Sequence, residues 1–164
     1  MFAWHVNFAW DANMIKILVA NRGQADLYET SALGASLMRV RTFTNESAYL
    51  HESDLVSDGP GRVYNRVAGI HQSYGQRHSI RDKATEKFTR DIAGLMTAEI
   101  GGVDCLGLVL IGAPRLINRL QHVLPSSVRA KLIGVIPKDL AHQAPLEISR
   151  CLRSASRDGF LRAK

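Results

Sequence analysis

The chain contains few cysteines, with only Cys105 and Cys151 in 164 residues. Two cysteines cannot form the several disulfides on which small secreted domains depend. Cys105 opens an apolar segment that we expect to be a strand, and Cys151 lies in a late helical pattern. We therefore expect both to be small buried hydrophobic side chains in a reducing, cytoplasmic setting.

Long hydrophobic runs are also missing, because no apolar stretch approaches the roughly 18 to 20 residues of a membrane span. Residues 1–13 lack the basic start, apolar centre and small-residue cleavage site of a secretory signal. They hold both tryptophans and repeat Phe-Ala-Trp, whereas Met14 begins a segment that reads like a natural start. We expect residues 1–13 to be an accessory, flexible extension.

Motifs for cofactors, metals and covalent catalysis are absent as well. Gly59-Pro60-Gly61-Arg62 lacks the lysine and hydroxyl of a Walker loop, and no Rossmann fingerprint occurs. There is no G-x-S-x-G nucleophile elbow. The histidines show no ligand spacing with cysteines or carboxylates. The sequence predicts no cofactor and no metal.

The composition and length are those of one globular domain with a full-sized core: 46% of residues are hydrophobic and 22% charged. The net charge of +6 is unevenly distributed. Residues 60–90 carry seven Lys or Arg against two acids, and residues 150–164 carry five against one. Such local basicity favours a polyanionic partner over simple solubility, although two solvated helix faces would show the same pattern.

Hydrophobic periodicity predicts five strands and three main helices. The expected strands are Ile15–Ala20, Gln24–Glu29, Leu37–Thr44, Leu106–Ile111 and Leu132–Ile136. Helices are expected from Ser79 to Ile100, after Pro114 and after Pro145, with a short turn before Lys131. Three strands in a meander followed by alternating helices and strands indicate a mixed α/β fold. We expect a single domain with a mixed five-stranded sheet flanked by helices.

The longest expected helix follows a loop of about 35 residues, from Asn45 to His78, that is rich in glycine and arginine. Loops of this length in a compact domain are functional or disordered. Ser79 and Asp82 form an S-x-x-D capping pattern, which marks a helix start. An apolar stripe then runs from Ala84 to Ile100. A basic loop leading into an anchored helix is where we expect function.

The candidate nucleic-acid-binding residues lie in this loop and helix start: Arg62, Arg66, Arg77, Arg81, Lys83 and Lys87. Together they could grip phosphates, while Tyr64 and Tyr74 stack on unpaired bases. No RNA-binding motif of known spacing accompanies them. The alternative is a soluble loop whose charges contact nothing.

A second candidate site follows the last two buried strands, at Arg115, Lys138, Asp139 and His142. Ligands of open α/β sheets favour the crevice beyond the carboxyl ends of strands. Asp139 and His142 have the chemistry of an acid/base pair, as in a small hydrolase. The alternative is that Asp139 caps a turn and Arg115 neutralises a neighbouring carboxylate.

From Met14 onward the chain resembles the bacterial host attachment protein family. The resemblance covers about residues 14–153 and rests on Ile17–Ala25, Ser57–Arg62, Phe88–Ala93, Leu108–Leu116 and Lys138–His142. It implies a domain at 14–153, followed by a basic tail at 154–164. The family's name implies a role in attachment to host cells.

That family is in turn similar to the middle domain of archaeal and eukaryotic peptide-chain release factors. The resemblance implies a mixed five-stranded sheet and a glycine-rich loop that enters the ribosome. In those factors the loop carries Gly-Gly-Gln before a long basic helix, whereas this chain has Tyr74-Gly75-Gln76. We expect a non-enzymatic module that contacts ribosome or structured RNA. The alternatives are a small hydrolase and a protein-interaction factor that acts indirectly in attachment.

Overall fold

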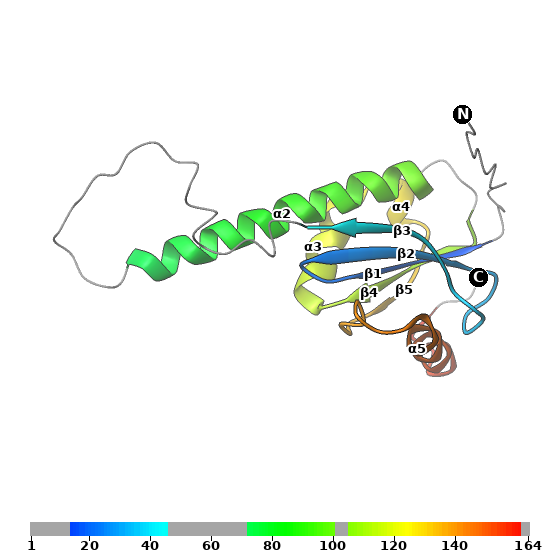
Figure 1. The fold of residues 1–164 in the computed structure, drawn as a ribbon. Coiled ribbons are helices and arrows are strands. Elements are labelled where there is room, and N and C mark those ends of the chain that lie inside the picture. The colour runs from blue at the N-terminus through cyan, green and yellow to red at the C-terminus, as the bar shows by residue number, and fades with distance from the viewer. Residues whose placement is uncertain (1–13, 46–71, 101–104, 162–164) are drawn as a thin grey trace, which may run out of the picture.

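The structure is a computed structural model of the 164-residue chain, and it describes residues 14–45, 72–100 and 105–161 (Figure 1). Side chains at the start of the long helix are described from Asp82 onward. The expected extension at residues 1–13, the loop at 46–71 and the last residues of the basic tail, 162–164, lie outside the described residues.

A five-stranded mixed sheet forms the centre of the fold, with strand order β3-β2-β1-β4-β5. Its strands are β1 (Ile15–Ala20), β2 (Gln24–Thr30), β3 (Met38–Thr44), β4 (Gly107–Gly112) and β5 (Leu132–Ile136). The first three form an antiparallel meander, while β4 lies parallel to both β1 and β5. The predicted fold class and the central position of the first strand are confirmed.

Helices cover both faces of this sheet (Figure 1). They are α2 (Gln72–Ile100), α3 (Pro114–Val123), α4 (Ser126–Arg129) and α5 (Pro145–Arg157). Alternate residues of β1 face opposite layers, because side chains of a strand alternate. Leu18 packs into a hydrophobic cluster with α2, α3 and α4, whereas Ile17 packs into a second cluster with α5.

The long helix α2 begins at Gln72, seven residues before the predicted start at Ser79. The prediction was wrong because a Ser-x-x-Asp pattern also fits a helix interior, and because a glycine such as Gly75 is more typical of a loop. One glycine inside a helix costs only about 1 kcal/mol relative to alanine. Tyr74-Gly75-Gln76 therefore lies within the helix rather than in a preceding loop. The end of α2 at Ile100 is confirmed.

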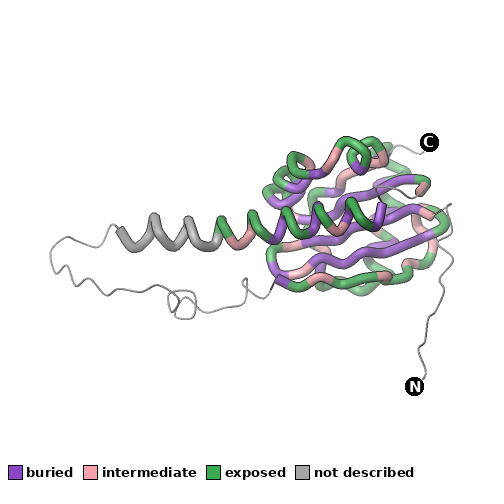
Figure 2. The backbone as a smooth tube through the Cα atoms, turned by 90° about the horizontal axis from the view of Figure 1, so that it is seen from above, coloured by how far each residue is buried: buried purple, intermediate pink, exposed green. Residues whose placement is uncertain are grey.

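Among the described side chains of α2, those that pack on the sheet lie in its second half. Phe88, Ile92, Met96 and Ile100 are buried at helical spacing, while the described side chains before Phe88 are exposed or half-buried (Figure 2). The first half extends past the sheet (Figure 1). The protein thus presents a helix anchored at one end.

Two groups of polar side chains are buried on the sheet, Lys16 with Glu29 and Tyr28 with Asp26. Lys16 of β1 is 3% exposed and contacts Glu29, its neighbour across the β1–β2 ladder. Burial lowers the pKa of Lys16, against the opposing effects of nearby Cys105 and Glu99. Burial and the Asp26 carboxylate raise the pKa of Tyr28, and nearby Arg39 partly offsets this increase.

The cysteines are less buried than predicted. Cys105 and Cys151 are both half-buried free thiols, because each lies at the rim of a hydrophobic cluster rather than inside it. Among the described helices, none is long and apolar enough to cross a membrane.

Candidate functional site

The carboxyl ends of β1, β4 and β5 meet at one end of the sheet, because the three strands run parallel. Asn21 follows β1, Arg115 follows β4 and Lys138 follows β5. The first half of α2 extends past this same end (Figure 1). We call it the carboxyl end of the sheet.

The backbones of β1 and β4 lie unusually close here. A Cβ atom on Gly112 would be 2.4 Å from the carbonyl oxygen of Ala20, a separation that real Cβ atoms do not show. Glycine is thus required at the last position of β4. Pro114 then starts α3, as predicted, since its fixed φ suits the first turn of a helix.

Asn21 and His142 are brought together, 121 positions apart in the sequence. The Oδ1 atom of Asn21 accepts hydrogen bonds from the backbone N–H groups of Gly23, at 2.8 Å, and Gln24, at 2.9 Å. The side-chain amide nitrogen must then face His142, whose Nε2 lies 3.1 Å away. We assign His142 Nε2 as the acceptor, which places the ring proton on Nδ1.

The other predicted crevice residues also lie at the carboxyl end. Asp139 accepts a 3.3 Å hydrogen bond from the backbone N–H of Ala141, so it caps a turn. Within the described ranges, no hydrogen bond or ion pair joins Asp139 to His142 or to Arg115. The acid/base pair that a hydrolase would need is therefore not assembled in this structure.

The nucleic-acid candidates are placed unevenly. Arg62 and Arg66 lie outside the described residues, and Arg77 and Arg81 belong to the helical backbone at the start of α2. Lys83 and Lys87 are exposed one turn apart on α2. They lie on the side of the helix opposite its buried stripe, since both are about half a turn from the buried positions.

Arginines on α2 and α3 extend the same basic surface. Arg90 follows Lys87 on α2 and bonds Glu86 at 2.5 Å, with both side chains more than half exposed. Arg119 of α3 contacts Asp82 of α2 at 3.2 Å and joins the two helices. Sequence reasoning missed Arg119 and Asn21. Arg119 could have been predicted to face outward, because it lies off the apolar stripe of Leu116, Ile117 and Leu120 on α3.

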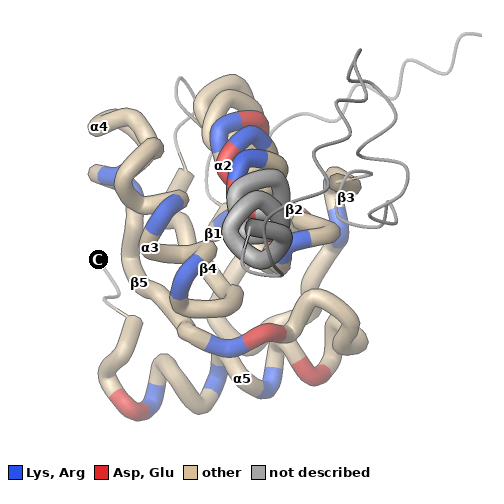
Figure 3. Tube along the Cα trace, turned by 90° about the vertical axis from the view of Figure 1, so that its left-hand side faces the viewer, with Lys and Arg blue, Asp and Glu red and all other residues tan. Residues whose placement is uncertain are grey.

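Lys and Arg positions of α2, α3 and the loops after β1 and β5 gather at this end (Figure 3). The described cations are exposed and come from four segments: Arg22, Lys83, Lys87, Arg115, Arg119 and Lys138. The described acids among them are Asp82, Glu86 and Asp139. Of these, Asp82 and Glu86 each pair with an arginine, so the positive charge of the two α2 lysines is left facing outward.

Among known proteins, one family resembles this chain over most of its length. The model of a family described as "protein required for attachment to host cells" matches residues 16–152. No curated protein matches the chain.

Among solved structures, two archaeal chains share 14% sequence identity with this one. The first is described only as an "Archaeal protein"; 90% of this chain aligns with 39% of it, at a TM-score of 0.44. The second is the archaeal translation termination factor aRF1, with 90% of this chain aligned to 40% of it, also at a TM-score of 0.44. The chain spans about two fifths of the length of either structure.

Proposed function

The chain belongs to the family of proteins required for attachment to host cells, and we propose that it acts as a non-enzymatic, cytoplasmic module that contacts structured RNA, such as ribosomal RNA. The contact surface is the outward side of α2 together with the carboxyl end of the sheet. Attachment to host cells then depends on this protein indirectly, through the RNA that it engages.

The concentration of unneutralised cations beside a projecting helix is the observation that supports the proposal. A basic stripe along a helix is the electrostatic footprint of a nucleic-acid-binding surface. Lys83, Lys87 and Arg90 follow one another at four- and three-residue spacing, so they span about 10 Å of one helix side. This stripe lies where α2 begins to pack on the sheet, on the side of the helix that faces solvent, so it is open to a partner beside the projecting start of α2.

Acidic residues on α2 are arranged so that they do not oppose this contact. Asp82 points to α3, where Arg119 binds it, and Glu86 is bound by Arg90. The side of α2 opposite the sheet thus carries the two lysines, with the exposed Asp91 one turn after Lys87 as the acid on that side among the described residues. Arg62, Arg66, Arg77 and Arg81 precede this stripe in the sequence, and we include them in the proposed RNA contact.

The test is ribosome co-sedimentation over a range of salt concentrations, with wild type beside a Lys83→Ala/Lys87→Ala variant. RNA binding should weaken steeply with salt, and the slope of log affinity against log salt should fall by about 1 for each lysine that contacts a phosphate. The matched control is Asp91→Asn, which changes an exposed charge on the same helix and should not weaken binding.

Two outcomes would overturn the proposal: a wild-type protein that does not sediment with ribosomes or bind structured RNA, and a double variant with an unchanged salt slope. A purification in which only protein partners survive nuclease treatment would instead support the protein-interaction alternative.

A further inference from the structure

A groove of about 500 Å³ lies between β5 and α5, on the face of the sheet opposite α2. Its apolar lining includes Val135, Leu140, Ala155 and Phe160. Gln143, Ser154 and Asp158 supply hydrogen-bonding groups along the same walls. An apolar hollow of this volume with a few convergent polar groups is typical of a site for a small ligand.

Phe160 stands at the rim of this groove and is 70% exposed, more than any other large hydrophobic side chain in the described part of the chain. Its backbone is fixed on both sides. The N–H of Phe160 donates to the carbonyl oxygen of Ala155 at 3.0 Å, after Gly159 has turned the chain with a positive φ of 74°. The next residue, Leu161, is buried and forms an antiparallel bridge with Gly134 of β5.

This arrangement fixes the backbone that carries an exposed aromatic ring at the rim of the groove, at a cost in exposed apolar area. An exposed aromatic beside a hollow is a platform on which another flat ring can stack.

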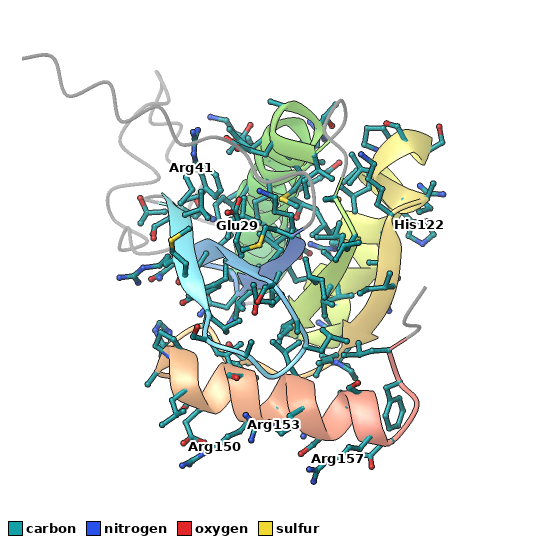
Figure 4. All side chains as sticks on the ribbon, turned by 90° about the vertical axis from the view of Figure 1, so that its right-hand side faces the viewer. Glu29, Arg41, His122, Arg150, Arg153 and Arg157 are labelled. Carbon is teal, nitrogen blue, oxygen red and sulfur yellow. The ribbon has the colours of Figure 1, made fainter. Side chains whose placement is uncertain are left out.

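Arginines run along α5 beside the groove. Arg150 and Arg157 lie two turns apart and point away from the sheet, and Arg150 lines the groove, whereas Arg153 turns toward the β2–β3 loop (Figure 4). Arg150 bonds Glu147 at 2.6 Å, and Arg153 bonds the carbonyl oxygen of Gly34 at 2.7 Å. A guanidinium has five N–H donors, so each retains donors for a phosphate.

The acids of α5 lie on the groove side of this arginine row. Glu147 and Asp158 line the groove, together with Arg150. A phosphate is therefore directed to the arginine row, whereas a neutral ring with donor groups suits the groove itself. Apolar floor, stacking platform, polar walls and an adjacent cationic row are the parts that an unpaired nucleotide requires.

We propose that the groove between β5 and α5 binds an unpaired nucleobase of single-stranded RNA. The base stacks on Phe160, its edge meets Gln143, Ser154 or Asp158, and the flanking phosphates contact Arg150 and Arg157. The identity of the polymer rests on the proposed RNA-binding function, but the residues involved are separate from those of α2.

The test measures the affinity of the whole chain for three ligands by fluorescence anisotropy or competition. They are a short single-stranded RNA, the same strand with its central base removed, and a free mononucleotide. The intact strand should bind at least about five-fold more tightly than the abasic strand, the lower bound for one base stacked on an aromatic ring. In Phe160→Ala this preference should vanish.

Further variants separate stacking from charge. Phe160→Leu keeps an apolar side chain without a ring, so it should lose the preference as Phe160→Ala does. Arg157→Ala should weaken both strands equally and lower the salt slope by roughly 0.7. Because Phe160 and Arg157 are exposed, these changes should leave the thermal midpoint unchanged, which checks the fold.

Three results would overturn the inference: no preference for the intact strand in wild type, a preference that survives in Phe160→Ala, or a mononucleotide that binds as tightly as the strand. The proposed function is tested separately by Lys83→Ala/Lys87→Ala, which should lose affinity for a structured RNA while keeping the preference for an unpaired base.

Discussion

Lys16 and Glu29 show what a single buried charge requires of its surroundings. Both lie in adjacent strands beneath α2, with side-chain exposures of 3% and 11%. Transferring two charges from water into the core is costly, and their mutual attraction and hydrogen bonds offset that cost. Glu99 of α2 lies near this pair and is itself bound by Arg41 of β3 at 3.0 Å. The buried charges therefore connect the sheet with the helix above it.

Replacing Glu29 with Gln should lower the free energy of unfolding by about 1 to 3 kcal/mol, because the buried ammonium of Lys16 loses the carboxylate that contacts it while Glu99 remains nearby. Urea denaturation would measure the change. The control is Glu86→Gln, which breaks an exposed pair with Arg90 and should cost less than about 1 kcal/mol. The double change Lys16→Met/Glu29→Leu should recover most of the loss. Equal costs for the buried and exposed pairs would contradict this account.

Tyr28 makes the stability of the protein depend on alkaline pH. Its pKa in the folded chain is raised above 10.0 by burial and by Asp26. Above pH 10.0 the unfolded chain loses this proton while the folded chain still holds it, so stability falls as pH rises through that window. In Tyr28→Phe that part of the decline should be absent. Denaturation at about pH 9 and about pH 11 would show it, and parallel losses in both proteins would disprove it.

Among the elements, strands were easier to predict from the sequence than helix boundaries. β1 and β4 are each six residues long, mostly apolar and fully buried, so their hydrophobic pattern predicts a buried strand in both cases. The start of α2 was missed because the sequence has no apolar stripe before Ala84 that would indicate a helix. Without that stripe, Gly75 indicated a loop and the Ser79 cap pattern indicated a helix start, and the predicted boundary followed these two signals.

Two glycines in different elements should respond oppositely to alanine. A Cβ on Gly94, on the exposed side of α2, would meet nothing within 4 Å, so Gly94→Ala should stabilise the protein by about 1 kcal/mol through helix propensity. A Cβ on Gly112 would meet the Ala20 carbonyl oxygen at 2.4 Å, so Gly112→Ala should destabilise by roughly 1 to 3 kcal/mol. Thermal or urea unfolding tests both, and a change of the same sign in the two variants would contradict the close approach of β1 and β4.

For the whole molecule, the order of elements in the sequence was enough to predict the layers of the fold. The contacts that define its sites were not predictable in the same way. Asn21 and His142 meet across 121 positions, and Phe160 reaches the groove only because Leu161 returns to the edge of β5. Such contacts depend on how complete elements pack, and no local pattern encodes them. The charge of α2 and α5, by contrast, could be read directly from the sequence.

The two proposed RNA contacts lie on opposite faces of the sheet, since α2 covers one face and α5 the other. If both exist, one protein molecule should hold a structured RNA and a single strand at the same time. Energy transfer between a donor-labelled hairpin and an acceptor-labelled strand should therefore appear with wild type. Lys83→Ala/Lys87→Ala should reduce it by releasing the hairpin, and Phe160→Ala by releasing the strand. Competition between the two RNAs instead of simultaneous binding would mean that they share one surface, and the assignment of α2 and α5 to separate contacts would be wrong.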